Sequence, residues 1–322
     1  HSWPELRARN DWHALGWRNE YWSCLEVSGA LMREAADLGM RLHSVLFLSD
    51  EAAHWGQQKL PAAWQGLTPE GQAAAVEAHA RAVATYYQSL GLNIEVFELG
   101  NEIDAGAFGL LLWDTVTPPA GVDPLNDPAW MRANLWARVA PLLRAAGRGV
   151  KSVFPQAKLM LHVGGFGYSR DELAASAFFE SMAALDVPFD LAGLSFPYMM
   201  FDQGLPQPFF TAPAFLAALD RIALLGRPIQ IVEVGYNAKP EGTAVPSPAY
   251  PYSPQGQADF LRDMAIAVRG RVQSLIAFYP DWHDGQDASA PGLEGLGLFS
   301  APGVPRPALE VFNSIAENGP GA

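Results

Sequence analysis

Two acidic residues that each follow an apolar, β-rich stretch of the chain could carry out acid–base and nucleophilic chemistry as a pair. Glu102 stands at a Gly-Asn-Glu corner that ends the stretch 96–103, and Glu233 follows an Ile-Val pair in the stretch 229–236. Cleavage of a glycosidic bond with retention needs one acid to protonate the leaving oxygen and one carboxylate to attack. We predict that Glu102 is the general acid/base and Glu233 the nucleophile. The alternatives are that Glu102 caps a turn and that Glu233 belongs to a buried ion pair; Glu98 is interpreted as structural.

Other polar and aromatic side chains near predicted strand ends are candidates for binding a sugar. Asn101 is expected to hydrogen-bond the sugar 2-hydroxyl, a contact that strengthens toward the transition state. Tyr198 and His162 are expected to support the two carboxylates, Tyr198 by donating to Glu233, although a single His at a strand end also serves as ordinary structure. The tryptophans that could stack on sugar faces, with core packing as the alternative, are Trp55, Trp113 and Trp282. The rim contacts that we consider are Asp50 and Gln257.

These residues must be positioned by an alternation of strands and helices, which the hydrophobic pattern predicts from residue 28 onward. Polar residues gather after the apolar strands rather than before them, as at the active-site end of a TIM barrel. We predict an α/β fold, a TIM (β/α)8 barrel that forms one domain over residues 1–322, with an irregular Trp-rich segment at 1–22. The first two barrel strands are missing or not recognisable. The readable strands are 44–48, 96–102, 158–163, 190–196, 229–233 and 274–279, and the helices are 28–39, 69–90, 135–146, 171–184, 214–225 and 254–268.

Composition and missing motifs exclude several other classes of protein. The formal net charge of -13, without a basic stripe, argues against a nucleic-acid partner. The one cysteine, Cys24, cannot form an internal disulfide, and no apolar run reaches the roughly 18 residues of a membrane span. The sequence lacks a His-carboxylate cluster, a G-x-G-x-x-G motif and a G-x-S-x-G elbow. We therefore expect no metal, no cofactor and no membrane partner, and the sequence leaves the oligomeric state open.

Short motifs follow one another along most of the chain. They are Ser49-Asp50 with Gly56-Gln57-Gln58, Gly100-Asn101-Glu102-Ile103, Leu161-His162, Gly193-Leu194-Ser195, Val232-Glu233 with Tyr236, Ser253-Pro254-Gln255-Gly256-Gln257, and Phe278-Tyr279 with Trp282. In the order and spacing of these motifs, the chain resembles glycoside hydrolase family 53, the endo-β-1,4-galactanases of the retaining (β/α)8 clan. This resemblance implies that the readable strands are the third to eighth of the barrel, that Tyr236 joins the substrate-binding residues, and that the substrate is a galactan-like polysaccharide. Family analogy implies a secreted protein, although this chain carries no signal peptide.

The chain also departs from the family pattern where sugars are bound. The Asp and His that the family has before its Ser-Asp pair correspond here to Val45 and Phe47, and His54-Trp55 replaces an Asp-Pro pair. The Trp-Glu pair expected after Phe278-Tyr279 is missing or shifted. Two alternatives therefore stay open. One is another activity of the clan, such as a β-mannanase or β-glucanase, and the other is a carbohydrate-binding pseudo-glycosidase that does not turn substrate over.

Overall fold

The chain divides into two compact units. A computed structural model describes residues 25–46, 48, 60, 62–164, 173–197, 210, 213–240, 249–280, 283–284 and 294–318. The first unit consists of His1–Gly164 with Ala177–Ala192, and the second of Gly165–Ser176 with Gly193–Ala322. Each unit carries one of the two predicted catalytic glutamates, and each is described by itself.

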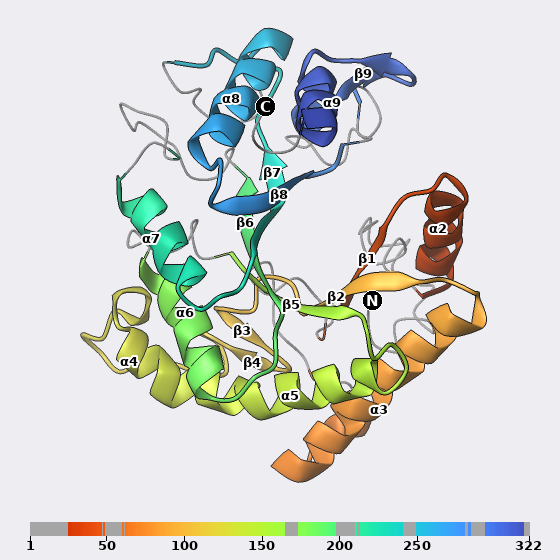
Figure 1. Cartoon of the computed structure of the whole chain (residues 1–322). Helices are drawn as coiled ribbons and strands as arrows, with labels where there is room; N and C mark the ends of the chain where they lie inside the picture. The colour runs from red at the N-terminus through yellow and green to blue at the C-terminus, as the bar shows by residue number, and fades with distance from the viewer. Residues whose placement is uncertain are drawn as a thin grey trace. The chain divides into compact units, whose positions relative to one another are not determined.

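Three parallel strands form the sheet of the first unit, in the order β1-β2-β5 (Figure 1). They are β1 (Leu42–Leu46), β2 (Ile94–Leu99) and β5 (Lys158–Val163). Leu46 pairs with Leu99, and Phe97 of β2 pairs with Leu159 of β5. Because the strands are parallel and in register, their carboxyl ends meet at one edge of the sheet. The prediction for β5 is confirmed to the residue, whereas β1 starts and ends two residues earlier than expected.

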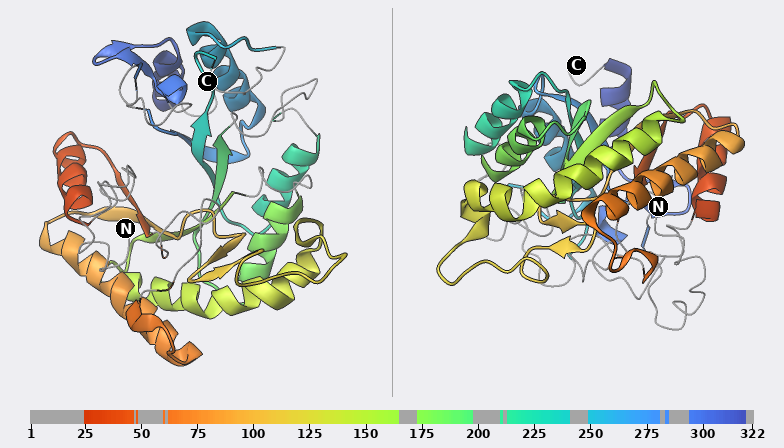
Figure 2. Two further views of the ribbon diagram at one scale, coloured as in Figure 1. Left: turned by 180° about the vertical axis from the view of Figure 1, so that it is seen from behind. Right: turned by 90° about the horizontal axis from the view of Figure 1, so that it is seen from below.

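Two long helices of the first unit, α3 (Pro69–Ser89) and α5 (Ala137–Lys151), lie side by side (Figure 2). A Cβ on Gly149 of α5 would lie only 2.4 Å from the carbonyl oxygen of Glu77, so the missing side chain lets the helices approach closely. The start of α3 was readable in the sequence. Thr68 accepts a hydrogen bond from the Gly71 amide and Pro69 follows it, which confirms the predicted cap.

Shorter elements complete the first unit, and several of them were not predicted. Helix α2 (Leu25–Asp37) precedes β1. Between β2 and α5 the chain forms a small antiparallel ribbon where the sequence was read only as a corner and a loop. The elements of this connection are β3 (Gly106–Ala107), β4 (Leu110–Leu111), η4 (Pro124–Asn126), α4 (Pro128–Met131) and the π-helical η5 (Arg132–Trp136).

The second unit holds the remaining strands in the order β6-β7-β8. Strand β6 (Leu191–Pro197) begins in the first unit, and β7 (Ile229–Gly235) pairs in parallel with β8 (Val272–Ala277). Ser253 caps α8 (Pro254–Ala267) by accepting from the Gly256 amide, as the sequence predicted. The other elements are α6 (Leu173–Ala184), which spans the division, α7 (Pro213–Ala223), η8 (Glu294–Leu296), β9 (Phe299–Ala301), β10 (Val304–Pro305) and α9 (Ala308–Asn318).

Each unit packs its own aromatic core. In the first, the ring of Phe97 lies 5.4 Å from that of Phe154 and 6.4 Å from that of Tyr87. In the second, Tyr236 stacks on Phe260 with ring centroids 4.4 Å apart. Within the described residues, none of the helices combines the length and the hydrophobicity that a membrane crossing requires.

Candidate active site

Glu102 lies in a tight corner directly after β2. Gly100 and Glu102 both have positive φ angles, 95° and 49°. For a residue with a side chain this conformation costs ~1–3 kcal/mol and is typical of functional sites. The next residue, Ile103, donates its amide to the carbonyl of His162 at 2.9 Å, which ties the corner to the end of β5. Glu102 is thus held in one orientation, and its side chain is buried at 5% exposure.

The side chain of Glu102 packs against Gly164, the residue that follows β5. A Cβ at this position would lie 2.9 Å from Cδ of Glu102 and 3.1 Å from its Oε1, so the carboxyl packs against bare backbone. The amide of Gly164 donates to Oδ1 of Asp104 at 2.9 Å. The carboxyl groups of Glu102 and Asp104 therefore both contact Gly164. Burial of the Asp104 carboxyl raises its pKa to about 6, an effect that the Gly164 hydrogen bond opposes and the charge of Glu102 reinforces.

Glu98, four residues before Glu102, is buried and pairs with two histidines. Glu98 of β2 contacts Nδ1 of His162 through Oε1 at 2.7 Å and Nε2 of His43 through Oε2 at 3.1 Å. Burial alone would raise the pKa of Glu98, but the charges and hydrogen bonds of the two imidazoles outweigh it and hold the pKa at about 2. The sequence interpretation of Glu98 as structural agrees with this pairing. We call the following residues the carboxyl cluster: Glu98, Glu102, Asp104, His43 and His162.

Two of the predicted sugar contacts lie near this corner in the chain and differ in exposure. Asn101 is half-buried beside Glu102. Trp113 is 55% exposed, which is unusual for so large an apolar side chain. Its backbone has a φ of 66° and donates to the Val116 carbonyl at 3.0 Å. An exposed, backbone-anchored indole is available to stack on a ligand.

Glu233 of the second unit lies near the end of β7 and is half-buried. The chain that follows β7 turns into the core. Tyr236 is fully buried, and its hydroxyl donates to the Tyr250 carbonyl. The resemblance implies that Tyr236 is a substrate-binding residue, and this stays a prediction; in the structure its ring packs on Phe260.

Gln257 was expected at the rim of the site, and this expectation is wrong. The side chain is fully buried. Its Nε2 lies 2.9–3.2 Å from four carbonyl oxygens in two distant parts of the chain. These belong to Tyr236, Gly295, Leu296 and Gly297. An amide group has only two N–H donors, so this is a shared, close-packed arrangement rather than four separate bonds.

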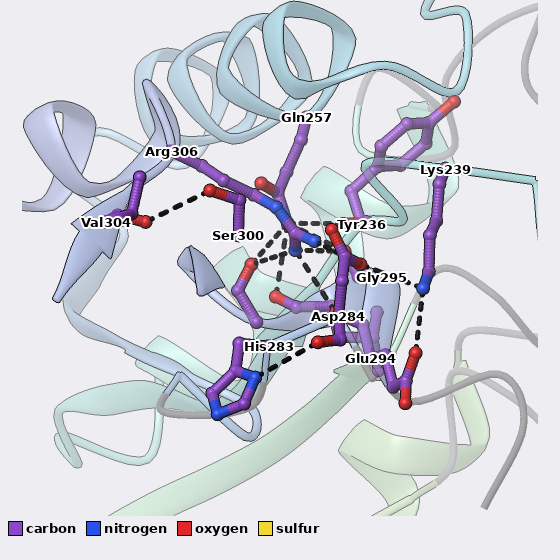
Figure 3. A network of polar contacts seen from close by, with 12 residues as sticks. Tyr236, Lys239, Gln257, His283, Asp284, Glu294, Gly295, Ser300, Val304 and Arg306 are labelled. Atoms are coloured by element: carbon purple, nitrogen blue, oxygen red, sulfur yellow. Dashed lines mark hydrogen bonds and ion pairs between the residues drawn. The ribbon is translucent and has the colours of Figure 1, made fainter. Parts of the chain in front are cut away.

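Arg306 completes the same network (Figure 3). Arg306 is buried, with 4% of its surface exposed. Its Nη1 donates to the Gly297 carbonyl at 2.7 Å and to the Glu294 carbonyl at 3.1 Å. Nη2 donates to the carboxylate of Asp284 at 2.9 Å, which Lys239 also contacts at 2.8 Å. We call Gln257, Arg306 and the carbonyls of residues 294–297 the carbonyl clamp. It fixes segment 294–297 against the chain that follows β7.

Several predicted site residues lie outside the described residues: Asp50, Trp55, Tyr198 and Trp282.

Asp104 was not predicted as a site residue, although its position two residues after Glu102 indicated that it would lie near the same strand end. Among the residues that the structure describes, no three His, Cys, Asp or Glu side chains are grouped so as to hold a metal ion.

Comparison with known proteins identifies the family. The model of glycosyl hydrolase family 53 matches residues 12–312. An arabinogalactan endo-β-1,4-galactanase of Thermothelomyces thermophilus is 25% identical over 310 residues, which cover 90% of this chain and 82% of that protein. A protein of Niallia circulans, described only by its position 5′ of bgaB, is 28% identical over 80% of this chain and 68% of its own length.

Solved structures agree on the fold. The catalytic domain of family 53 from Ignisphaera aggregans superposes with a TM-score of 0.68 at 21% identity, covering 89% of this chain and 77% of that one. A fungal β-1,4-galactanase gives 0.68 at 23%, covering 90% and 82%. A xylanase from Caldicellulosiruptor owensensis gives 0.57 at 15%, covering 90% and 83%. The predicted TIM barrel is thereby confirmed, and the chain belongs to glycosyl hydrolase family 53 and is a glycoside hydrolase.

Proposed function

We propose that this enzyme cleaves a β-1,4-linked galactan with retention of configuration, using Glu102 as acid/base and Glu233 as nucleophile. The observation that carries the proposal is the setting of Glu102. It is buried in a strained corner at the end of a strand and packs on the backbone of Gly164. Burial favours the protonated carboxyl that a general acid needs near neutral pH.

In the proposed reaction Glu233 attacks the anomeric carbon while Glu102 protonates the leaving glycosidic oxygen. Glu102, now ionised, then takes a proton from a water molecule that displaces Glu233 from the sugar. Asn101 hydrogen-bonds the 2-hydroxyl, and the exposed indole of Trp113 stacks on a sugar ring. The reaction needs no cofactor.

The choice of galactan rests on the relatives that are described as arabinogalactan endo-β-1,4-galactanases. A β-mannan or β-glucan is the second candidate, because Val45 and Phe47 replace the Asp and His that the family pattern has in those places. We propose further that the whole chain acts as one catalytic domain and that it works outside the cell, where such polysaccharides are found.

The test is hydrolysis of β-1,4-galactan, β-mannan and β-glucan by the wild type, Glu102→Gln and Glu233→Gln. We expect galactan to be cleaved and both variants to lose activity by ~10²–10⁴-fold or more. Glu95→Gln is the matched control, since Glu95 is a carboxylate of the same strand β2 that pairs with the exposed Arg41 instead.

Cleavage of mannan or glucan alone would replace the substrate but keep the mechanism. Full activity of either glutamine variant would contradict the assignment of that residue. Binding of glycan by a folded wild type without turnover of any polysaccharide would contradict the proposed catalytic function.

A further inference from the structure

The corner that carries Glu102 is tied through its backbone to neighbouring elements of the first unit. The amide of Ile103 donates to the His162 carbonyl in β5 at 2.9 Å. Two residues further along, the Ala105 carbonyl accepts from the amide of Leu112, which directly follows β4, at 3.0 Å. A strained backbone such as that of Glu102 persists only where its surroundings fix it in several ways.

Between these two bonds, a side chain also holds the corner. The indole nitrogen of Trp136 donates to the carbonyl oxygen of Asp104 at 2.8 Å, two residues after Glu102. Asp104 is held through its side chain as well, because the amide of Gly164 donates to its Oδ1 at 2.9 Å. Asp104 is thus bonded to η5 through its carbonyl and to the residue after β5 through its carboxyl.

Trp136 is itself firmly placed. It ends the π-helical segment η5, which lies between α4 and α5, and π-helical turns within longer helices are frequent at functional sites. The residue is buried at 3% exposure, and its ring packs edge-on against Phe178 of α6 with centroids 5.5 Å apart. A buried indole N–H needs an acceptor, and the carbonyl of Asp104 supplies it.

The simpler interpretation is that this bond satisfies a buried donor and only stabilises the fold. Its position favours a further role, because it fixes the second residue after a strained glutamate on which the reaction is proposed to depend. A general acid must lie within hydrogen-bond reach of the oxygen that it protonates, and a displacement of ~1 Å costs ~10²-fold in rate.

We propose that Trp136 is a positioning residue for the general acid: its indole N–H, bonded to the Asp104 carbonyl, holds the corner so that Glu102 reaches the glycosidic oxygen. The inference rests on the proposed function, because it takes Glu102 as the acid. It assigns Trp136 no contact with substrate, since the side chain is buried. Loss of the bond therefore weakens proton donation and leaves the attack by Glu233 unchanged.

Trp136→Phe removes the donor and keeps an aromatic ring beside Phe178. Its kcat/KM is measured on aryl β-glycosides whose phenols differ in acidity, built on the disaccharide of the polysaccharide that the wild type cleaves (galactobiose for galactan). Phenol is a poor leaving group that needs a proton from the acid, whereas dinitrophenolate leaves without one. We expect kcat/KM to fall about tenfold for the phenyl glycoside and to stay within about twofold for the dinitrophenyl glycoside.

Two further variants calibrate this measurement. Trp130→Phe is the matched control, because it makes the same change in the neighbouring helix α4, where Trp130 bonds to Asp127 and Asn134 through its backbone. It should keep the leaving-group dependence of the wild type. Glu102→Gln removes the acid itself and should show the same selective loss, larger in size.

The outcomes are distinguishable. A loss confined to poor leaving groups in Trp136→Phe supports the inference. An equal loss for every leaving group, or no loss, overturns it and leaves the proposed function intact if Glu102→Gln shows the selective loss. If Glu102→Gln does not show it, the proposed function fails, and with it the role of Trp136.

A second variant applies if Trp136→Phe does not fold. Incorporation of benzothienylalanine in place of Trp136 exchanges the indole N–H for a sulfur atom and keeps the size and shape of the ring. We expect the same selective loss with poor leaving groups, because only the hydrogen-bond donor is removed. The leaving-group dependence of the wild type in this protein would overturn the inference.

Discussion

The carboxyl cluster of the first unit and the carbonyl clamp of the second are both polar networks buried at or beyond the ends of parallel strands, but they are made of different groups. In the carboxyl cluster, acids face imidazoles and one another, so both partners of each contact can change protonation. In the carbonyl clamp, a guanidinium and an amide face mainly backbone carbonyls, which do not titrate in water.

Because their groups differ, the two networks respond differently to pH. The clamp holds segment 294–297 in place at any ordinary pH, because arginine stays charged up to a pH of about 12. The cluster holds Glu102 in a fixed orientation while its protons respond to pH and to one another. In the proposed mechanism Glu102 gives up and regains a proton, and a residue with that role needs surroundings like those of the carboxyl cluster. Four substitutions test this division, in decreasing order of the expected change in stability.

Arg306→Met should cause the largest loss. It removes the buried guanidinium that donates to the Glu294, Gly295 and Gly297 carbonyls and to the Asp284 carboxylate, and only part of this is replaced by Gln257, so the free energy of unfolding is expected to fall by about 3 kcal/mol. The loss should be the same at pH 5 and pH 8, because no partner titrates between them. Arg271→Met, which removes an exposed pair with Asp220, is the control and should change little in urea denaturation. Similar small losses in both variants would contradict the clamp.

Glu98→Gln should lower the free energy of unfolding by about 2 kcal/mol at pH 7. The folded pKa of Glu98, about 2, lies below its unfolded value. Its stabilisation is therefore present above pH ~4 and is lost as the pH falls through 2. Urea denaturation at pH 7 and pH 2.5 should show a large difference between variant and wild type at the first and a small one at the second. The exposed Glu34→Gln should show no such dependence; a difference that is equal at both pH values would be inconsistent with the pairing.

Gly164→Ala should lower the free energy of unfolding by roughly 1–2 kcal/mol through crowding and also reduce kcat by tenfold or more. Its methyl group would push on the Glu102 carboxyl, 2.9 Å away. Gly71→Ala is the matched control, because its Cβ would meet its neighbours at ordinary distances of 3.4 Å and longer. Loss of stability without loss of kcat would show that Glu102 tolerates displacement.

Asp104→Asn should have the smallest effect, and the effect should be a gain. An acid whose folded pKa is raised, here to about 6, costs stability as the pH rises from the unfolded value through the folded one. The asparagine variant should therefore be more stable than the wild type by about 1 kcal/mol at pH 8, a figure reduced for partial exposure, and equal to it at pH 4. Thermal unfolding at both pH values measures this. A variant that is less stable at pH 8 would contradict the raised pKa.

The sequence was sufficient where the structure is local. Thr68 and Pro69 determine the start of α3 by themselves, and the apolar run at 158–163 forms β5 because it is buried along nearly its whole length. The corner at Glu102 was predicted for a similar reason, since Gly100 permits the positive φ that the turn requires.

The networks could not be predicted, because their partners are far apart in the chain. Glu98 and His162 are 64 residues apart. Gln257 looks like a polar residue at the exposed start of a helix until the carbonyls of residues 295–297 fold over it. Helix α9 was not predicted from the sequence.

The most direct test of the central claim is rescue of Glu102→Ala and Glu233→Ala by azide, with an activated aryl β-galactobioside as substrate. Azide should restore activity in both variants but give different products. Glu102→Ala should yield the β-glycosyl azide, because azide attacks a covalent intermediate on Glu233. Glu233→Ala should yield the α-glycosyl azide, because azide takes the place of the missing nucleophile. The same anomer from both variants would contradict the assigned roles.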